Sequence, residues 1–540
     1  MDTPFAITLP VGTSRANHTG SWRVERPVYV DRLPPCNNAC PAGENIQGWL
    51  YHAESGDYES AWRTLVEDNP LPATMGRVCF HPCESACNRV QVDEAVGINA
   101  VERFLGDAAI EKGWALPGAG PDTGKRVLVV GSGPAGLSAT YHLRRRGHAV
   151  HLVDVAAQLG GMMRYGIPAY RLPRAVLDAE IARVLALDVE VTLDHRVDDV
   201  EVERRAGGYD AVFLAVGAQI GRRVSVPAGD SARIVDAVNF LHAVADDDPP
   251  LLGRRVIVYG GGDTAFDAAR TAKRLGASDA VIVYRRNREK MPASDEEFEQ
   301  ALGEGVTMRW LSSVKSFTGE RLVVEKMMLN AQGFPEPTGE VEELDADALV
   351  LALGQDTDLS LIEAHPEVKV DEGVLSVSAT MMTGLAGVFA GGDATPADRT
   401  ATVAVGHGKR AARGIDDYLA GRGPAQATKH DLATFERLNT WYYADAPRTQ
   451  RPQLERIRRQ GTFDEVILGL TEENALFEAR RCMSCGNCFE CDNCFGVCPD
   501  NAVIKLESGK YEFNYDFCKG CGICVAECPC GAIEMVPERI

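Results

Sequence analysis

The first notable feature of this sequence is where it lacks cysteine. Its 540 residues include 16 cysteines, yet nearly four hundred consecutive residues in the middle have none. Five cysteines lie between Cys36 and Cys87, and eleven lie between Cys482 and Cys530. Because a secreted disulfide protein is short and rich in cysteine throughout, this distribution argues against a disulfide scaffold. Two tight groups on either side of a cysteine-free body predict metal binding instead.

The sequence also lacks the marks of a membrane or nucleic-acid-binding protein. No apolar run reaches the length of about 18 residues that indicates a membrane helix. The N-terminal MDTPFAITLP has neither the basic region nor the long apolar core of a signal peptide. The net charge of −21 leaves no broad basic face for nucleic acid. We therefore expect a cytoplasmic protein, and its length predicts roughly three or four domains.

The side-chain sets of the common hydrolases are missing as well. The sequence has no Ser–His–Asp set, no paired catalytic carboxylates and no zinc-protease motif, and its 11 histidines are scattered. We therefore predict no catalytic side chain, and we expect bound cofactors to supply the chemistry.

The C-terminal cysteines form two copies of one pattern. The spacing C-x2-C-x2-C-x3-C-P begins at Cys488 and again at Cys518. This is the pattern of bacterial two-cluster ferredoxins, in which the fourth cysteine of each run binds the other cluster. Thiolates are soft ligands that suit iron–sulfur chemistry. The predicted ligands of the two [4Fe–4S] clusters are Cys488, Cys491, Cys494 and Cys528 for one, and Cys518, Cys521, Cys524 and Cys498 for the other.

Three cysteines of this region lie outside both runs. Cys482 and Cys485 precede the first run at the same spacing, and Cys530 follows the second. The first two are interpreted either as unliganded thiols or as an alternative register for the first cluster. A zinc ribbon is the competing interpretation of the whole region, but it needs only paired C-x2-C knuckles. Two complete four-cysteine runs favour iron–sulfur clusters.

Residues 126–154 carry the pattern of a dinucleotide-binding unit. The apolar run Val127–Val130 predicts a buried strand, and G-x-G-x-x-G follows it from Gly131. These glycines allow a tight turn and close approach of the backbone to a pyrophosphate at the N-terminus of the next helix. The following strand ends on Asp154, in position to bind a ribose hydroxyl.

The pattern returns at residues 255–286 with one difference. Its fingerprint starts at Gly260, but Arg285 and Arg286 stand at the end of its second strand, where the first unit has an acid. An acid at this position binds a free 2′-hydroxyl, whereas arginine binds a 2′-phosphate. The sequence therefore predicts FAD at the first site and NADPH at the second. Two solvated arginines on a surface loop are the alternative.

A third signal lies at residues 387–412. A short apolar strand ends in Gly391, Gly392 and Asp393, and a helix of small residues begins near Thr402. The N-terminal N–H groups of that helix can receive an electron-rich ring. An ordinary strand–loop–helix turn is the alternative interpretation.

Together these segments resemble one family. They are VVGSGPAGLSA, LGGMMRYGIPAYRLP (159–173), VYGGGDTAFDAA, VYRRNREKMPA (283–293) and FAGGDAT. They resemble the small, flavin-containing subunit of bacterial glutamate synthase and its relatives. Those relatives include the NADPH-binding N-terminal half of dihydropyrimidine dehydrogenase and the large subunit of NADH-dependent ferredoxin:NADP oxidoreductase. The resemblance covers roughly residues 36–420.

The resemblance implies an α/β fold with two Rossmann-like domains between two iron–sulfur domains. The expected domains are an N-terminal α-helical iron–sulfur domain (1–119), an FAD domain in two parts (120–240 and 340–420), an NADPH domain (241–339), a connector (421–480) and a C-terminal α+β ferredoxin domain of the bacterial type (481–540). The motifs and the resemblance together propose as dinucleotide-binding residues Gly131, Gly133, Pro134, Ala135, Gly136, Asp154, Gly160, Gly161, Arg164, Gly260, Gly262, Asp263, Thr264, Ala265, Arg285, Arg286, Gly354, Gly392, Asp393, Thr402, Val403 and Ala404. Among them, the resemblance places Gly160, Gly161 and Arg164 beside the flavin.

The resemblance also implies an N-terminal iron–sulfur cluster. In relatives, one cluster takes three cysteines and a Gln or Glu, which correspond here to Cys40, Cys79, Cys83 and Glu102. Because Cys79 and Cys83 lie closer together than the corresponding cysteines of the family, Cys36 or Cys87 is the alternative ligand. The family's two cysteines further upstream are replaced here by Val28 and Asp31. We therefore expect one N-terminal cluster where relatives have two.

These cofactors predict one type of activity. Hydride carriers move two electrons together, iron–sulfur clusters move one at a time, and flavin links the two. We expect an NADPH-dependent oxidoreductase that passes electrons between NADP(H), FAD and [4Fe–4S] clusters. The expected partner is a ferredoxin or another subunit of a hetero-oligomer such as glutamate synthase or a 2-oxoacid:ferredoxin oxidoreductase. A redox sensor or scaffold with structural clusters is the alternative from a different class.

Overall fold

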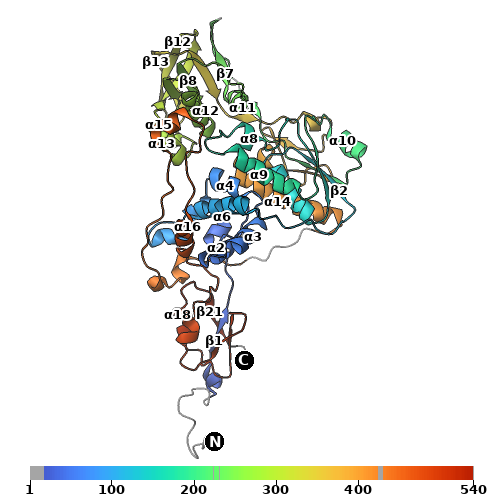
Figure 1. Ribbon diagram of the computed structural model, residues 1–540, viewed down its shortest axis with the longest axis vertical. Coiled ribbons are helices and arrows are strands. Elements are labelled where there is room, and N and C mark those ends of the chain that lie inside the picture. The colour runs from blue at the N-terminus through green and yellow to red at the C-terminus, as the bar shows by residue number, and fades with distance from the viewer. Residues whose placement is uncertain (1–17, 223, 230, 424–429, 539–540) are drawn as a thin grey trace, which may run out of the picture.

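The computed structural model describes residues 18–222, 224–229, 231–423 and 430–538. Along its long axis, an α/β unit, a helical layer and a small cysteine-rich unit follow one another, and a second α/β unit projects to one side (Figure 1). No helix in these ranges is both long and apolar enough to cross a membrane.

The laterally projecting unit carries the first glycine fingerprint on a parallel sheet of five strands. Across the sheet these are β18 (Val388–Ala390), β5 (Ala211–Leu214), β2 (Arg126–Val130), β3 (Ala149–Val153) and β4 (Glu190–Thr192). Strand β2 is buried along nearly its whole length, as expected when helices cover both faces of a parallel sheet. Helices α7 (Pro134–Arg145) and α14 (Ala401–Leu419) pack together so closely that a Cβ on Gly408 would lie 2.3 Å from the carbonyl oxygen of Ala135.

The other α/β unit carries the second fingerprint. Its parallel sheet consists of β10 (Thr307–Arg309), β9 (Asp279–Val283), β8 (Arg255–Gly260), β14 (Ala348–Ala352) and β7 (Ile234–Asp236). An antiparallel sheet of β11 (Ser312–Phe317), β12 (Arg321–Leu329) and β13 (Pro335–Asp345) lies beside it. Its helices are α11 (Ala237–Ala245), α12 (Asp263–Arg274) and α13 (Asp295–Gly303). Because β14 and β7 are hydrogen-bonded into this sheet, the unit extends beyond the 241–339 expected for it at both ends.

The helical layer between the two ends has a core of aromatic and leucine side chains, including the fully buried Trp49 and Trp62. Its helices are α1 (Pro35–Ala39), α2 (Ile46–Glu54), α3 (Tyr58–Val66), α4 (Pro72–Val78), α5 (Pro82–Ser85) and α6 (Ile98–Lys112). The three that start with proline use its fixed φ at the first helical position. Cys40 and Cys79 are the C-cap residues that directly follow α1 and α4, so helix termini place both thiols.

The cysteine-rich unit combines the two ends of the described chain. Strand β1 (Glu25–Tyr29) pairs antiparallel with β21 (Ile533–Pro537). The rest of the unit is a hairpin of β19 (Val503–Lys505) and β20 (Tyr511–Phe513) with two short helices, α17 (Asn493–Gly496) and α18 (Ile523–Ala526). Residues 25–29, expected within the N-terminal helical domain, thus complete a sheet at the other end of the sequence.

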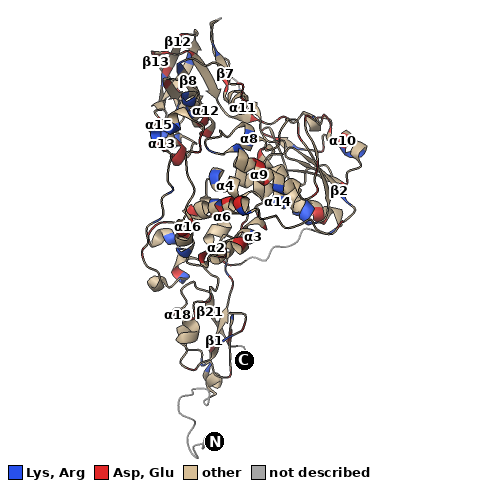
Figure 2. Ribbon diagram, in the orientation of Figure 1, with Lys and Arg blue, Asp and Glu red and all other residues tan. Residues whose placement is uncertain are grey.

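The connector packs on the body of the protein at two places. The basic helix α15 (Arg456–Gly461) lies beside the acidic α13 (Figure 2), and Gln460 Nε2 donates to the carbonyl of Glu304 at 2.7 Å. Helix α16 (Glu472–Arg480) packs against α2 and α6 of the helical layer. The remaining elements are α8 (Met162–Tyr165), α9 (Arg174–Leu185), α10 (Val200–Gly207), β6 (Ile220–Gly221), β15 (Gln355–Asp356), β16 (Val370–Asp371), β17 (Val374–Leu375) and short 3-10 turns.

Candidate functional site

One large cavity lies where the two α/β units meet, with a volume of about 1160 Å³. Residues of both glycine fingerprints line it, and so does the loop that follows β18. The carboxyl ends of parallel strands are the usual binding edge of such sheets. Two dinucleotides bound to the two fingerprints would therefore share a single space.

The first fingerprint is built for close backbone approach. Gly131 has φ of 102°, and a Cβ there would lie 2.4 Å from the carbonyl oxygen of Ala215. A Cβ on Gly136 would lie 1.8 Å from the carbonyl oxygen of Gly131. Glycine is therefore required at both positions. The turn delivers the N-terminus of α7, capped by Gly133, to the cavity, where its free N–H groups suit a pyrophosphate.

Asp154 lies buried at the end of β3 and lines the same cavity. Its Oδ2 accepts a hydrogen bond from the backbone N–H of Ser132 at 2.6 Å, and its Oδ1 accepts one from that of Ala156 at 2.9 Å. These contacts hold the carboxylate at the cavity edge, where a ribose hydroxyl can donate to a remaining lone pair.

The second fingerprint places two arginines at the cavity. Arg285 is exposed, Arg286 is half-buried, and both line the cavity wall beside Gly260 and Thr264. Within the described ranges, the buried Nε of Arg286 has no hydrogen-bond partner. A buried N–H without an acceptor is costly, so this atom is suited to donate to an oxygen of a 2′-phosphate.

The loop after β18 also lines the cavity, next to the first fingerprint, where a Cβ on Gly392 would lie 3.2 Å from the Ala135 Cβ. Gly392, with φ of 68°, Asp393 and Ala404 line the cavity. His407 Nδ1 accepts a hydrogen bond from the Gly392 N–H at 3.1 Å and so fixes the loop. Burial lowers the pKa of His407 to about 4, which keeps the ring neutral and able to accept this bond.

The cavity contains most of the expected dinucleotide-binding residues. Those that line it are Gly131, Gly133, Pro134, Ala135, Asp154, Gly161, Gly260, Gly262, Asp263, Thr264, Arg285, Arg286, Gly354, Gly392, Asp393 and Ala404. Those outside its lining are Gly136, Gly160, Arg164, Ala265, Thr402 and Val403. Gly136 and Ala265 support the fingerprints from behind. Arg164 does not line the cavity; its Nε donates to the carbonyl of Leu159 at 2.6 Å and its Nη2 pairs with Asp178.

Two lining residues were not among the predicted binding residues, although both lie in segments that carry the family resemblance. A Cβ on Gly261 would lie 2.4 Å from the Tyr284 ring, so this glycine lets the ring pack against the fingerprint. Arg171 reaches the cavity from a loop of the first unit and pairs with Asp267 of α12 at 2.7 Å. The pairing of Arg171 with Asp267 has no local signature, because the fold brings the two residues together from distant segments.

Cys40, Cys79, Cys83 and Glu102 come together next to this cavity. Val78 and Phe80, the two neighbours of Cys79, line the cavity itself. Burial raises the pKa of the Cys83 thiol, and the nearby Cys79 and Cys40 sulfurs raise it further. The Oε1 of the buried Glu102 accepts from Asn69 Nδ2 at 2.9 Å, and burial together with Glu44 raises the pKa of Glu102.

Cys36 and Cys87, the alternative ligands for that group, lie at a different place. They line a separate small cavity that also contains Cys482 and Cys485. Burial raises the pKa of the Cys36 thiol, and the Cys482 and Cys87 sulfurs raise it further. The structure therefore separates the N-terminal cysteines into two groups.

The C-terminal cysteines are arranged as the crossed ferredoxin pattern expects. Cys498 lines one small cavity with Cys518, Cys521 and Cys524. Burial raises the pKa of Cys494, and the sulfurs of Cys488, Cys528 and Cys491 raise it further, so Cys528 lies with the first run. Among the described residues, no three His, Cys, Asp or Glu side chains converge as a site for one metal ion.

Family models match three parts of the chain. Residues 125–408 match pyridine nucleotide-disulphide oxidoreductase, residues 26–114 match the 4Fe-4S cluster domain II of dihydropyrimidine dehydrogenase, and residues 511–534 match a 4Fe-4S binding domain.

The similar proteins include subunits of redox enzymes. NADP(+)-dependent formate dehydrogenase subunit beta from Moorella thermoacetica is 34% identical over 497 residues, which cover 84% of this chain and 70% of the relative. NADPH-Fe(3+) oxidoreductase subunit beta from Geobacter sulfurreducens is 30% identical over 519 residues, covering 86% and 77%. Glutamate synthase [NADPH] small chain from Azospirillum brasilense is 32% identical over 423 residues, covering 73% and 88%.

These matches confirm the predicted fold, the resemblance to the glutamate synthase small subunit, and the predicted classes of cofactor. They identify an oxidoreductase rather than a sensor or scaffold. This chain belongs to the pyridine nucleotide-disulphide oxidoreductase family and is an NADPH-dependent FAD/iron–sulfur electron-transfer protein with 4Fe–4S domains on either side of its flavoprotein body.

Proposed function

We propose that FAD binds over the N-terminus of α7 and that NADP(H) binds over Arg285 and Arg286. The observation that carries this assignment is that both fingerprints line one cavity. In that space a nicotinamide can meet the flavin ring, as hydride transfer requires. Arg286 binds the 2′-phosphate, and the Gly392 loop, fixed by His407, orients the flavin.

The iron–sulfur group held by Cys40, Cys79, Cys83 and Glu102 is proposed as the first acceptor beyond the flavin. When bound, FAD exchanges a hydride with NADPH and single electrons with iron–sulfur clusters. Val78 and Phe80 bring the Cys79 backbone to the cavity wall. Thr402 of α14, a neighbour of the cavity-lining Ala401, donates to the sulfur of Met75 at 3.7 Å and also contacts the Cys79 thiol. The expected cluster ligand Cys79 is thus flanked by cavity-lining residues in the chain and contacted by a helix that lines the cavity.

Electrons are proposed to leave or enter the protein at the ferredoxin-like unit. Cys488, Cys491 and Cys521 are exposed there. Trp441 is 88% exposed on the connector, next to Tyr442, whose hydroxyl bonds to Glu527 of the same unit. Aromatic side chains at a surface favour a protein partner. We propose a ferredoxin or another subunit of a hetero-oligomer, since two of the relatives carry the name of a beta subunit.

An anaerobic reduction experiment tests the internal route. NADPH should bleach the flavin of the wild-type protein and then produce reduced-cluster signals in EPR. The variant Cys79→Ser should keep the flavin bleaching and lose the reduction of the C-terminal clusters by NADPH. Dithionite, added to the same variant, should still reduce those clusters and so show that they are present. Normal cluster reduction by NADPH in this variant would contradict the proposed route.

The native mass tests the proposed partner. We expect the protein purified from its own host to form a complex with a second polypeptide. The native mass of that complex should exceed the mass of the copies of this 58.4 kDa chain that it contains. A species made of this chain alone, fully active with a small ferredoxin, would support the ferredoxin as the partner and exclude the stable hetero-oligomer.

A further inference from the structure

Four cysteines from opposite ends of the sequence line one small cavity. Cys36 and Cys87 come from the helical layer, and Cys482 and Cys485 come from the segment just before the ferredoxin-like unit. The cavity is about 20 Å³, the same as the cavity lined by the cysteines of the second ferredoxin site. Cys36, Cys87, Cys482 and Cys485 are all half-buried residues. In size, their cavity therefore matches one at an expected cluster site of this same protein.

The backbone around Cys482 has the conformation found at the other expected ligand loops. Ser484, two residues after Cys482, has φ of 46°, and its N–H donates to the Cys482 sulfur at 3.4 Å. His81, two residues after Cys79, has φ of 40° and makes the same bond at 3.2 Å. The first cysteine of each ferredoxin run has the same feature, through Glu490 (φ 61°) and Gly520 (φ 73°). Hydrogen bonds to cluster sulfurs are one means by which proteins tune a cluster.

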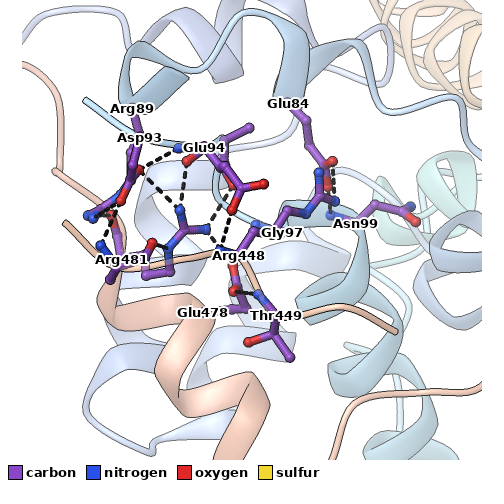
Figure 3. Close-up of polar contacts among 12 residues, drawn as sticks. Glu84, Arg89, Asp93, Glu94, Gly97, Asn99, Arg448, Thr449, Glu478 and Arg481 are labelled. Carbon is purple, nitrogen blue, oxygen red and sulfur yellow. Dashed lines mark hydrogen bonds and ion pairs between the residues drawn. The ribbon is translucent and has the colours of Figure 1, made fainter. Parts of the chain in front are cut away.

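A buried ionic network joins the segment that precedes Cys482 to the segment that follows Cys87; Figure 3 shows its members Arg89, Asp93 and Arg481. Arg481, only 2% exposed, precedes Cys482 and contacts Asp93 at 3.2 Å. Arg89, next but one after Cys87, binds the same carboxylate at 2.8 Å and donates to the carbonyl of Arg481 at 2.8 Å. Buried charges are tolerated when they are fully paired. This network fixes the two segments in one relative position.

The segment before Cys36 is engaged in another sheet. Val28 of β1 pairs with Glu534 in the sheet of the ferredoxin-like unit. No residue of β1 lines the small cavity, whereas Cys482 and Cys485 line it beside Cys36 and Cys87.

We propose that Cys36, Cys87, Cys482 and Cys485 bind a fourth [4Fe–4S] cluster, with ligands shared between the N-terminal domain and the C-terminal segment. Fifteen of the 16 cysteines then belong to four sets, and Cys530 alone has no cluster role. The proposal rests on the proposed function for its role as the relay between the Cys79 site and the ferredoxin-like unit. Tyr443 lies on that route, and its hydroxyl donates a hydrogen bond to the carbonyl oxygen of Met483 at 2.9 Å.

A metal count on anaerobically purified protein tests the proposal. The wild-type protein should contain about sixteen iron atoms per FAD, and the double variant Cys482→Ser/Cys485→Ser about twelve. The variant Cys530→Ser, which removes a buried thiol of the same region, should keep the wild-type count. FAD content and flavin bleaching by NADPH should be unchanged in both variants. A wild-type count of about twelve irons, or about one zinc lost with the double variant, would overturn the proposal.

Two further readouts keep the test decisive. If the double variant does not accumulate, Mössbauer spectroscopy of the wild-type protein counts the clusters directly, and three rather than four cubane equivalents would refute the fourth site. The proposed function fails separately, if NADPH does not bleach the wild-type flavin. In that case the iron count still decides whether the fourth cluster exists.

Discussion

The discrimination between NADPH and NADH should depend on Arg286. The Nε of this residue is buried at the cavity wall without an acceptor among the described residues, so a 2′-phosphate would give it a charge-assisted hydrogen bond. A hydrogen bond to a charged group contributes about 1.5–3 kcal/mol. Since about 1.4 kcal/mol corresponds to a factor of ten, Arg286→Gln should lower kcat/KM for NADPH by roughly ten- to a hundredfold. NADH lacks the phosphate, so its kcat/KM should hardly change.

The assay is anaerobic stopped-flow bleaching of the flavin by each nucleotide. Arg288 provides a matched control, because it lies two residues further along the same loop but stacks on the Phe298 ring, 4.5 Å from its centroid, and pairs with Asp295. Arg288→Gln should leave the preference for NADPH intact. An equal loss with NADH and NADPH in Arg286→Gln would mean that this arginine supports the fold of the loop, and no loss with either would refute its contact with the phosphate.

Three further predictions concern the flavin site and the ionic network. Gly136→Ala places a methyl group 1.8 Å from the Gly131 carbonyl oxygen, which cannot be accommodated without moving the turn. Overpacking of this kind costs about 1–3 kcal/mol. We expect the purified variant to lose much of its FAD absorbance while its secondary structure stays unchanged. Because burial lowers the pKa of His407 to about 4 from 6.5, the unfolded chain binds a proton between these values and the folded chain does not. Stability should therefore fall as pH drops from about 6.5 towards 4, and thermal melts of His407→Gln should show a shallower dependence; identical slopes would contradict this assignment. Arg481→Met leaves Asp93 and Glu478 with fewer partners in a buried site. Breaking a buried pair costs about 3–5 kcal/mol, so the midpoint of urea unfolding should fall. As a control, Arg63→Gln removes the half-exposed ion pair between Arg63 and Glu59 and should have little effect.

The parts of this protein that could be predicted from sequence are those made by neighbouring residues. Gly131 and Gly136 lie within a few residues of each other, and their role follows from the sterics of one turn. The two runs from Cys488 and Cys518 repeat a spacing that is itself the chemical signal. The matches to known families confirm the fold and cofactor classes that were predicted from these local patterns.

The direction in which a side chain points could not be predicted from the local sequence pattern. Arg164 follows Gly160 and Gly161, yet its guanidinium is bound by the carbonyl of Leu159 and by Asp178, and it does not line the cavity. Thr402 and Val403 sit on α14 beside Ala404, but only Ala404 lines the cavity, because successive residues of a helix point in different directions. Such outcomes are decided by how whole helices pack.

The sequence by itself determined the two dinucleotide units, the difference at Arg285 and Arg286, and the ferredoxin pattern, because each is specified by residues close together in the chain. Only the tertiary structure decided that β1 pairs with β21, and that Cys36 and Cys87 face Cys482 and Cys485. Nothing in the spacing of those cysteines marks them as one group, since almost four hundred residues lie between them. Their meeting depends on a buried network at Arg481 that forms only when distant segments have packed, and long-range packing has no local signature.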